Sequence, residues 1–410
     1  MPFDCDAVVI GAGAAGASAA IWLAQGGWQV TIVEQHAYPR RKVCGECIAA
    51  GNLPLLDQLE VGAAFRNSAG PELRRVGWMQ STTTASTEMP MAPGVYGYGR
   101  VLGRDRLDAL LLDRAQALGV RVLQPARVRA VSGSAGDFAC AIDVQRRNSL
   151  TIRAPVVLDA HGSWERAPTF SGHESSGPPR RRSSDLFAFK ANFRDSGLPA
   201  GFLPVLSLPG GYGGMVQGDD GRMTIACCLR RDALADCRAA MPDLAAGPAV
   251  EAHLRRYIAG VGDALEGARR DGAWLSVGPL APGIRVESAS GTFRVGNAAG
   301  ESHPLIGEGI SMALQSSSLL AAVLLRQPPA AICGVRAIAQ QRLYAHAWRR
   351  TFTRRLRLAA LFAHVAMRPA LAGPACRVLQ HWPALLRGGA RLTGKASSAV
   401  DPSFITPEIA

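Results

Sequence analysis

Residues 6–34 constrain the fold of this chain more than any other segment of its 410 residues. An apolar run at residues 7–10 predicts a buried parallel strand, and a G-x-G-x-x-G turn follows it directly. An alanine-rich helix and a second apolar run then lead to an acidic residue. In this strand–turn–helix–strand setting, the glycine spacing is typical of a site for an adenine dinucleotide, either FAD or a nicotinamide.

Each position of this turn has a predicted physical task. Gly11 makes the tight turn, Gly13 lets a pyrophosphate approach the backbone, and Gly16 packs the helix against the strand. The helix N-terminus offers free N–H groups and a partial positive charge to the phosphates. Glu34 lies at the offset expected of the acid that binds the ribose hydroxyls. The candidate cofactor-binding residues in this segment are Gly11, Gly13, Ala14, Ala15, Gly16, Glu34 and Gln35.

The charge and the cysteines limit the function classes. A net charge of +13 favours anionic cofactors, acidic carrier proteins, anionic lipid surfaces or nucleic acid. No basic motif interleaved with aromatic residues appears, so we predict no binding of nucleic acid, and nothing indicates an obligate protein partner. The nine cysteines are odd in number and scattered, which favours reduced thiols in the cytoplasm. No apolar run is long enough to span a bilayer, and we expect no secretory signal before the first strand.

A second glycine-rich turn decides between the two cofactors. It follows an apolar strand at residues 291–295, extends over residues 296–310 and leads into an apolar helix at residues 311–325. A nicotinamide dehydrogenase needs no such turn this far along the chain. In a flavoprotein, the turn contacts the ribitol-phosphate arm, and the helix N-terminus faces the N1/O2 edge of the flavin. The two turns together predict FAD, and no metal site is expected.

Three blocks identify a resemblance that spans some 300 residues. They are the 11–16 turn with Glu34, the Arg104-x-x-Leu-Asp108 segment, and residues 296–300 with 304–309. The chain resembles the FAD-dependent monooxygenases of the para-hydroxybenzoate hydroxylase fold, in the branch with geranylgeranyl reductases and flavin-dependent halogenases. The resemblance implies an α/β fold with a discontinuous, Rossmann-like FAD-binding domain, an antiparallel-sheet substrate domain and a C-terminal helical region. The expected FAD-binding domain covers residues 1–70, 99–165 and 276–328. The expected substrate domain covers residues 71–98 and 183–275, and the helical region covers residues 329–410.

The resemblance also implies site residues. Arg104 touches the FAD, Val128 lies near the adenine, and the segment around Asp159 and Gly162 is linked to FAD and to a reduced nicotinamide, NADPH or NADH. Cys44-Gly-Glu-Cys47 leaves a redox dithiol open by spacing alone, and it lacks the second pair of a structural zinc site. The family places this segment against the flavin, which disfavours a disulfide or metal role. The implied flavin contacts are Lys42, Cys44, Gly45, Gly296, Asn297, Pro304, Gly307, Glu308, Gly309 and Ile310.

Departures from the family pattern bear on the reaction. Asn297 stands where the family usually has aspartate, which removes a charge but keeps a hydrogen-bonding group. The W-x-W-x-I-P signature of the halogenases is absent, which disfavours halogenation. The aromatic block of the reductases keeps only its beginning, Gly211 and Tyr212, which weakens the likeness to a prenyl-chain reductase.

The most favoured function is therefore NAD(P)H-dependent hydroxylation of an electron-rich aromatic or polyketide-like molecule in secondary metabolism, through a flavin C4a-hydroperoxide. A reductase of isoprenoid or lipid double bonds and a non-enzymatic electron carrier are the alternatives. The candidate proton-transfer groups are His303, Tyr212 and Cys44, and also His161. Each of them has a plainer alternative role, such as capping a turn or packing.

The helices expected over residues 344–392 combine arginines with Leu, Ala and Phe. We expect them to cover the cavity for a lipophilic or aromatic substrate. Peripheral attachment to an anionic membrane is the alternative.

Overall fold

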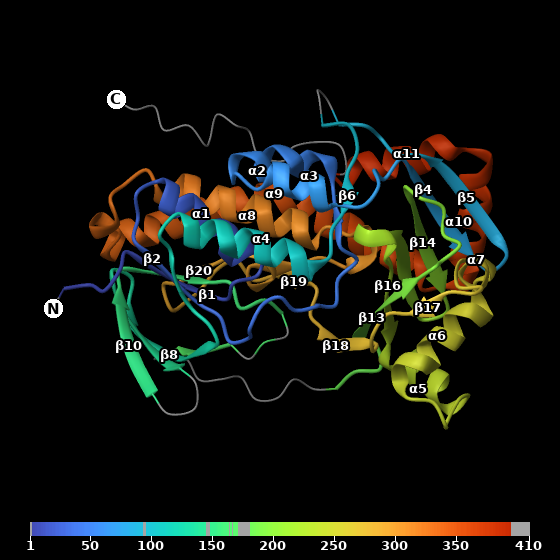
Figure 1. The fold of residues 1–410 in the computed structure, drawn as a ribbon, viewed down its shortest axis with the longest axis horizontal. Helices are drawn as coiled ribbons and strands as arrows, with labels where there is room; N and C mark the ends of the chain where they lie inside the picture. Colours follow the sequence, from blue (N-terminus) through green and yellow to red (C-terminus); the bar gives the residue numbers. More distant parts are fainter. Residues whose placement is uncertain are drawn as a thin grey trace.

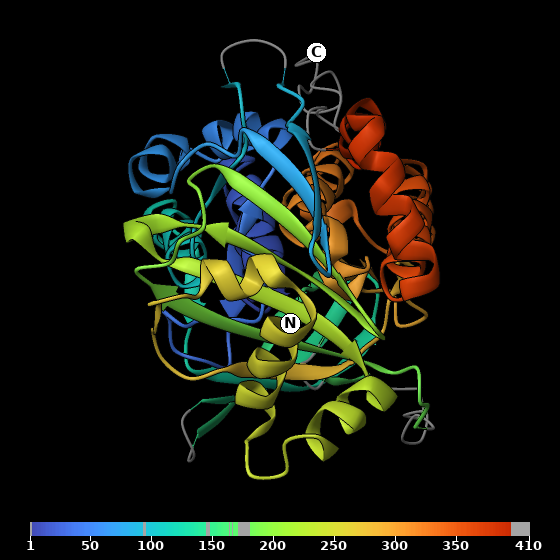
Figure 2. The same ribbon diagram turned by 90° about the vertical axis from the view of Figure 1, so that its right-hand side faces the viewer.

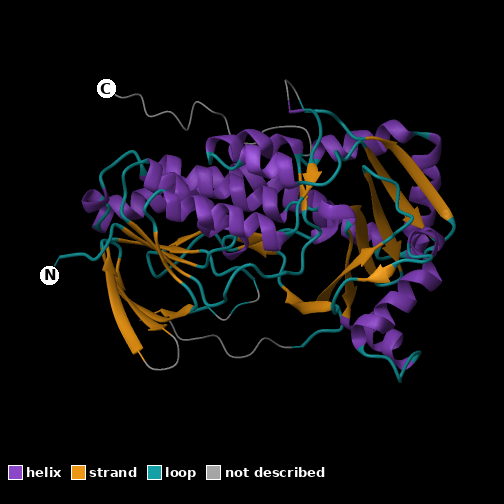
Figure 3. Cartoon of the chain, viewed as in Figure 1, coloured by secondary structure: helices purple, strands orange, loops and turns teal. Residues whose placement is uncertain are grey.

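The computed structural model describes residues 2–92, 96–144, 148–163, 165, 167–170 and 181–394. Two halves lie side by side along the long axis of the molecule (Figure 1). The first holds a five-stranded sheet between a helical layer and a four-stranded sheet, and the second is built around an eight-stranded sheet. Figure 3 shows the helices of the first half gathered on one side of its sheets. This arrangement confirms the predicted α/β fold class.

The five-stranded sheet is parallel throughout, in the order β20-β11-β1-β2-β7. Its three central strands are short runs of apolar residues, buried along their whole length. Their lack of alternation follows from the cover on both faces of the sheet. The strands are β1 (Ala7–Ile10), β2 (Val30–Val33), β7 (Arg121–Leu123), β11 (Val156–Asp159) and β20 (Phe293–Arg294).

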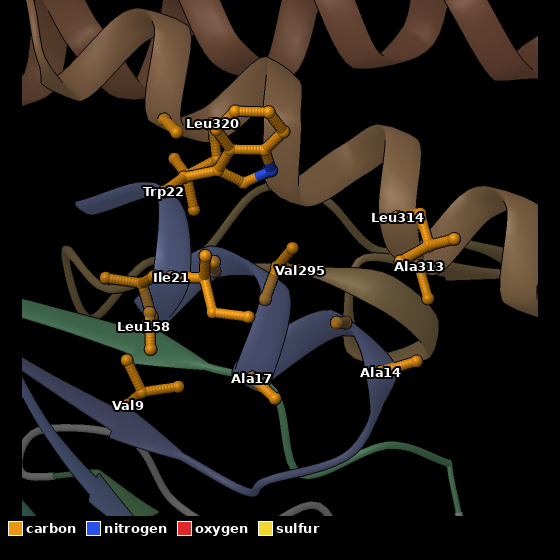
Figure 4. Packing of buried hydrophobic residues seen from close by; sticks show 14 of the residues in the cluster. Val9, Ala14, Ala17, Ile21, Trp22, Leu158, Val295, Ala313, Leu314 and Leu320 are labelled. Carbon is orange, nitrogen blue, oxygen red and sulfur yellow. The ribbon is translucent and has the colours of Figure 1, made fainter. Parts of the chain in front are cut away.

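Helices cover one face of this sheet. Ala17 and Ile21 of the first helix lie above Val9 and Leu158 of the sheet in Figure 4. Small residues on this helix, α1, let the neighbouring helix α8 approach closely. Both α1 and α8 are almost completely buried. The helices of the layer are α1 (Ala14–Gln25), α4 (Arg104–Ala117) and α8 (Gly309–Leu324), and α1 contacts both of the others.

A four-stranded sheet covers the opposite face. Its order is β10-β9-β8-β12, and its core joins Val128 and Ile142 to Val8 and Ile10 of the central strand. Side chains of β8 alternate between buried and exposed at the start of the strand, because only one of its faces packs. The strands are β8 (Ala126–Ser134), β9 (Asp137–Val144), β10 (Asn148–Ala154) and β12 (Thr169–Phe170).

The eight-stranded sheet runs β17-β13-β16-β15-β14-β4-β5, and β18 also pairs with β13. It is antiparallel except between β14 and β4. A cluster of buried apolar side chains joins one face to three helices, α5 (Arg231–Ala239), α6 (Ala246–Tyr257) and α7 (Ala259–Ala264). The strands are β4 (Arg75–Gln80), β5 (Thr83–Glu88), β13 (Leu186–Arg194), β14 (Phe202–Leu208), β15 (Gly211–Gln217), β16 (Met223–Arg230), β17 (Arg269–Arg270) and β18 (Leu275–Leu280).

The last helices connect the two halves. The long helix α9 (Gly334–Ala366) packs on α8, and α10 (Pro369–His381) and α11 (Pro383–Leu392) cover β4 and β5. Within the described ranges, no single helix is both long and apolar enough to cross a membrane, and only α9 and α10 together, bent by 105°, have the required length and composition. Residues 395–410 of the predicted C-terminal region lie outside the described residues. The remaining elements are α2 (Leu53–Gln58), α3 (Gly62–Ser68), β3 (Cys47–Ile48), β6 (Arg100–Val101), β19 (Gly283–Ile284) and β21 (Gly300–Glu301).

Candidate active site

A cavity of about 390 Å³ extends between the two halves of the molecule. Its wall begins at the glycine turn after β1, passes the second glycine-rich turn and ends at α11. The volume lies in the range of small-molecule and cofactor sites.

The first glycine turn leaves the N-terminus of α1 open toward this cavity. No side chain caps the helix, and Gly13, Ala14 and Ala15 line the cavity. The free N–H groups and the helix dipole therefore offer partial positive charge to a ligand. Gly11 has a φ of +101°, and a Cβ on Gly16 would lie 1.9 Å from the Gly11 carbonyl oxygen. Only glycine fits at these two positions, because one needs an unusual backbone and the other a close contact.

Glu34 is fixed in the wall beside this turn. It is 5% exposed, and its carboxylate accepts the Ala12 N–H at 2.8 Å and the His36 N–H at 2.9 Å. Gln35 lines the cavity next to it and donates to Glu165. Val128 of β8 lies in the same wall, so the structure brings together all three residues expected at the nucleoside end.

Two cations face the glycine turn and share one buried carboxylate. Lys42 donates to Asp108 at 2.8 Å, and Arg104 donates to both oxygens of Asp108 at 2.9 and 2.8 Å. Burial alone would raise the pKa of Asp108, but Arg104 and Lys42 hold it below its usual value. A Cβ on Gly13 would lie 3.6 Å from a nitrogen of each cation, so the turn and the cations border one space. Two cations and one anion leave a net positive charge, which fits the pyrophosphate of FAD.

The second glycine-rich turn packs directly on the first. A Cβ on Gly296 would lie 2.6 Å from the Ala15 Cβ. Asn297 lines the cavity, and its side-chain amide donates to Ser163 at 2.9 Å. Five predicted flavin contacts line the cavity from this turn, namely Asn297, Pro304, Gly307, Gly309 and Ile310. Gly296 and Glu308 lie behind the wall, and Glu308 is 1% exposed with Arg355 at 3.5 Å.

Asp159 also lies behind the wall rather than in it. It ends β11, is 1% exposed and contacts the Nδ1 atom of His161. His161 and Gly162 do line the cavity. In this structure Asp159 orients His161, and the predicted link of the segment to FAD and the nicotinamide stays a prediction.

Sequence reasoning missed the residue that holds the Cys44 loop in place. Glu46 is 2% exposed and accepts from Lys190, from the Thr224 hydroxyl at 2.7 Å and from the Arg104 N–H at 3.0 Å. It therefore ties the loop to β13, β16 and α4. Cys44 and Gly45 of this loop line the cavity, and no disulfide bond joins the nine cysteines, all of which lie within the described residues. A lysine within the apolar strand β13 was the available signal, because a buried lysine requires a partner.

The structure brings two of the catalytic candidates together. The Tyr212 hydroxyl of β15 lies 3.1 Å from Nδ1 of His303, and both residues line the cavity. Burial, and after it Cys228 and Glu301, raises the pKa of Tyr212 well above its usual value. Burial also lowers the pKa of His303. Both groups are therefore neutral near pH 7 and form a hydrogen-bonded pair that can pass a proton.

The cavity beyond this pair is apolar. Side chains from both halves and from the C-terminal helices form its wall. They include Val76, Trp78, Ala188, Phe189, Leu203, Val205, Leu305, Phe362, Leu379, Leu385 and Leu386. The described residues that β4, β13–β16 and α9–α11 contribute to this wall include no charged side chain.

Comparison with known proteins agrees with this geometry. Residues 4–187 match the family described as FAD binding domain. Menaquinone reductase from Mycobacterium tuberculosis is 26% identical over 335 residues, which cover 78% of this chain and 76% of that protein.

Solved structures share the fold. The myxobacterial chondrochloren halogenase CndH aligns with a TM-score of 0.74 at 17% identity, over 98% of this chain and 92% of that one. A geranylgeranyl bacteriochlorophyll reductase-like protein from Thermoplasma acidophilum aligns with a TM-score of 0.64 at 17% identity, over 98% of this chain and 94% of that one. Both alignments show that the chain shares the overall fold of these proteins. The chain is therefore similar to FAD-dependent oxidoreductases, and its residues 4–187 match the family described as FAD binding domain.

Proposed function

We propose that this protein reduces a carbon–carbon double bond of a lipophilic, isoprenoid-bearing substrate, with NADPH or NADH as the electron donor. The observation that carries the proposal is the apolar wall that β4, β13–β16 and α9–α11 form. The described residues that these elements contribute include no charged side chain, and Tyr212 pairs there with His303 of the second glycine turn. A long hydrocarbon chain suits such a wall, whereas a charged substrate would lose its hydration there without compensation. The similarity to menaquinone reductase over most of the chain supports the same substrate class.

The residues of the chain supply the proton for this reaction. When bound, FAD supplies a hydride at the end of the cavity near the glycine turns. The other carbon of the double bond then needs a proton, for which the Tyr212 hydroxyl is the candidate donor. With its own proton on Nδ1, His303 donates to the Tyr212 oxygen at 3.1 Å and replaces the proton that leaves.

The test is anaerobic turnover of a defined lipid. Holoenzyme reduced with dithionite is mixed with menaquinone in detergent micelles, and we expect flavin reoxidation. Air then reoxidises any quinol that forms, and the product should still be heavier by two hydrogen atoms, because a reduced carbon–carbon double bond is not reoxidised by air. Tyr212→Phe should keep its FAD and lose roughly 100-fold or more of this rate. Flavin that is reoxidised only by oxygen, with the lipid unchanged, would refute the reductase.

The second candidate is a monooxygenase of an electron-rich aromatic or polyketide-like molecule. The observation that favours it is the neutral His303 in the cavity wall, because a neutral imidazole can accept a phenolic proton. Substrate-dependent oxygen consumption with NADPH, and an oxygen atom gained by the product, would support it. A non-enzymatic electron carrier would show no faster flavin reoxidation with any substrate.

A further inference from the structure

The net positive charge of the chain resides in one segment. The whole chain has 45 Lys and Arg and 32 Asp and Glu, but residues 309–400 contain 13 Lys and Arg and no Asp or Glu. The rest of the chain, with 32 of each, has no net charge. The charge surplus is thus a property of α8–α11 and the residues after them, and not of the cofactor half as a whole.

Helices α10 and α11 combine this charge with exposed apolar side chains. Both pack their inner sides on β4 and β5, so their outer sides face solvent at the edge of the molecule (Figure 2). Leu371, Val378 and Trp382 follow one helical stripe and are 44%, 41% and 62% exposed. Leu392 of α11 is 51% exposed. We call these four side chains the outer apolar face.

Arginines flank the outer apolar face. Arg368, Arg377 and Arg391 are exposed, and none of them forms an ion pair with an acid in the part of the chain that the structure describes. A helix with apolar residues on one side, a large exposed Trp and unpaired arginines is typical of helices that lie in the interface of an anionic bilayer. Each such arginine adds to the attraction of the protein toward an anionic surface.

The same two helices form the end of the cavity. Leu379 of α10, and Leu386 and Gly389 of α11, line it. We infer that α10 and α11 lie on the surface of an anionic phospholipid bilayer through the outer apolar face, and that a lipophilic substrate passes from the acyl chains between these helices into the cavity. The route of the substrate rests on the proposed function, whereas binding to the bilayer needs no substrate.

Vesicle binding tests this inference. Holoenzyme is sedimented with phosphatidylcholine vesicles and with vesicles that also contain phosphatidylglycerol. We expect binding to the anionic vesicles, weakened at high salt. Trp382→Ser/Leu371→Ser should reduce it at least tenfold. The matched control Leu244→Ser/Tyr257→Ser removes two side chains that are each 41% exposed, on the α5–α7 side, and should bind like the unchanged protein. FAD content and melting temperature check that both variants fold.

Brominated lipids test how deep the helices lie. Bromine on the acyl chains should quench tryptophan fluorescence in the unchanged protein, and Trp382→Phe should lose that quenching. Equal binding of both double variants, or binding that ignores lipid charge, would overturn the inference. Dimers that form at higher protein concentration and no longer bind vesicles would also overturn the inference, because a second copy of the chain would then cover this face.

Activity separates this inference from the proposed function. The Trp382→Ser/Leu371→Ser variant should lose reduction of menaquinone in anionic vesicles but keep it in detergent micelles. A protein that binds vesicles as expected and reduces no lipid in either form would refute the function and leave the docking surface standing. Equal loss of activity in vesicles and micelles would overturn the route through α10 and α11.

Discussion

The two ends of the cavity are built in different ways. At the cofactor end, backbone N–H groups, glycines and buried charges come from short segments of the sequence, such as residues 11–16 and 104–108. At the substrate end, apolar side chains from the eight-stranded sheet and three helices meet only in the folded protein. The first kind of site depends on positions that admit one residue type, and the second on volume and shape. Substitutions at the cofactor end should therefore cost binding and stability, whereas those at the substrate end should mainly change selectivity.

The largest effect is expected for Gly16→Ala. The added Cβ would lie 1.9 Å from the Gly11 carbonyl oxygen, and backbone at that distance cannot give way without opening the turn. A gain of about 1 kcal/mol in helix propensity would not offset this. We expect protein without FAD, or no folded protein, as measured by flavin absorbance and thermal unfolding.

Gly262→Ala is the matched control for this change. Gly262 lies in α7, and a Cβ there would meet nothing within 4 Å. The variant should keep its FAD and gain up to about 1 kcal/mol in stability. If Gly16→Ala binds FAD as well as this control, the cofactor end is more tolerant than its geometry indicates.

Asp108→Asn should have the next largest effect. The carboxylate is fully buried between Lys42 and Arg104, and its loss leaves two cations without their anion. Loss of one partner from a buried charge pair costs about 3–5 kcal/mol. Denaturant unfolding measures the change, and Asp113→Asn on the exposed side of α4 should stay within about 0.5 kcal/mol.

The pH dependence of stability should differ between the unchanged protein and Asp108→Asn. The pKa of Asp108 is lower in the folded protein than in the unfolded chain. Its stabilisation is therefore complete above the unfolded pKa of about 3.9 and is lost as the pH falls toward the folded value. The acid limb of the stability curve should be shallower in Asp108→Asn. An unchanged limb would show that Asp108 does not titrate as its ion pairs with Arg104 and Lys42 indicate.

A smaller and more local effect is expected for Tyr212→Phe. The change leaves the ring in place and removes the hydroxyl that lies 3.1 Å from His303. We expect a stability loss of about 1–2 kcal/mol, an unchanged FAD content and a fall in kcat rather than a rise in KM.

The acid limb of the pH profile reports on His303. Burial lowers its pKa, so the neutral imidazole of the unchanged protein should persist below the usual value of about 6.5, and activity should fall only at lower pH. The same shift makes folding less favourable as the pH falls from about 6.5 toward the folded pKa, because the unfolded chain then binds the proton more readily. A limb at or above 6.5 would exclude His303 as the titrating group.

The difference between the two ends also explains what the sequence could predict. The 11–16 turn, Glu34 and the second glycine turn are recognisable because local backbone geometry requires glycine at fixed spacings. The pairing of Tyr212 with His303 could not be read from the sequence, because it depends on how β15 meets the turn after residue 303. The bond from Lys190 to Glu46 likewise joins residues 144 positions apart. Apolar residues such as Leu379 and Leu386 carry no signal that separates a cavity wall from a core.

The smallest effect on stability and the sharpest on selectivity should come from Gly389→Leu. Gly389 lines the cavity, and a Cβ there would lie 3.8 Å from the Phe362 ring, so a leucine side chain would fill the space between α11 and α9. Leucine is also the better helix former, so stability should stay within about 1 kcal/mol of the unchanged protein. We expect normal FAD content and a KM that rises several-fold for long isoprenoid quinones but not for short ones.

Gly388→Leu is the matched control, because Gly388 is the neighbouring position outside the wall and a Cβ there meets nothing within 4 Å. This variant should leave the FAD content and the KM unchanged. Equal behaviour of the two variants would mean that the substrate chain does not reach α11, and the apolar end of the cavity would then need another explanation.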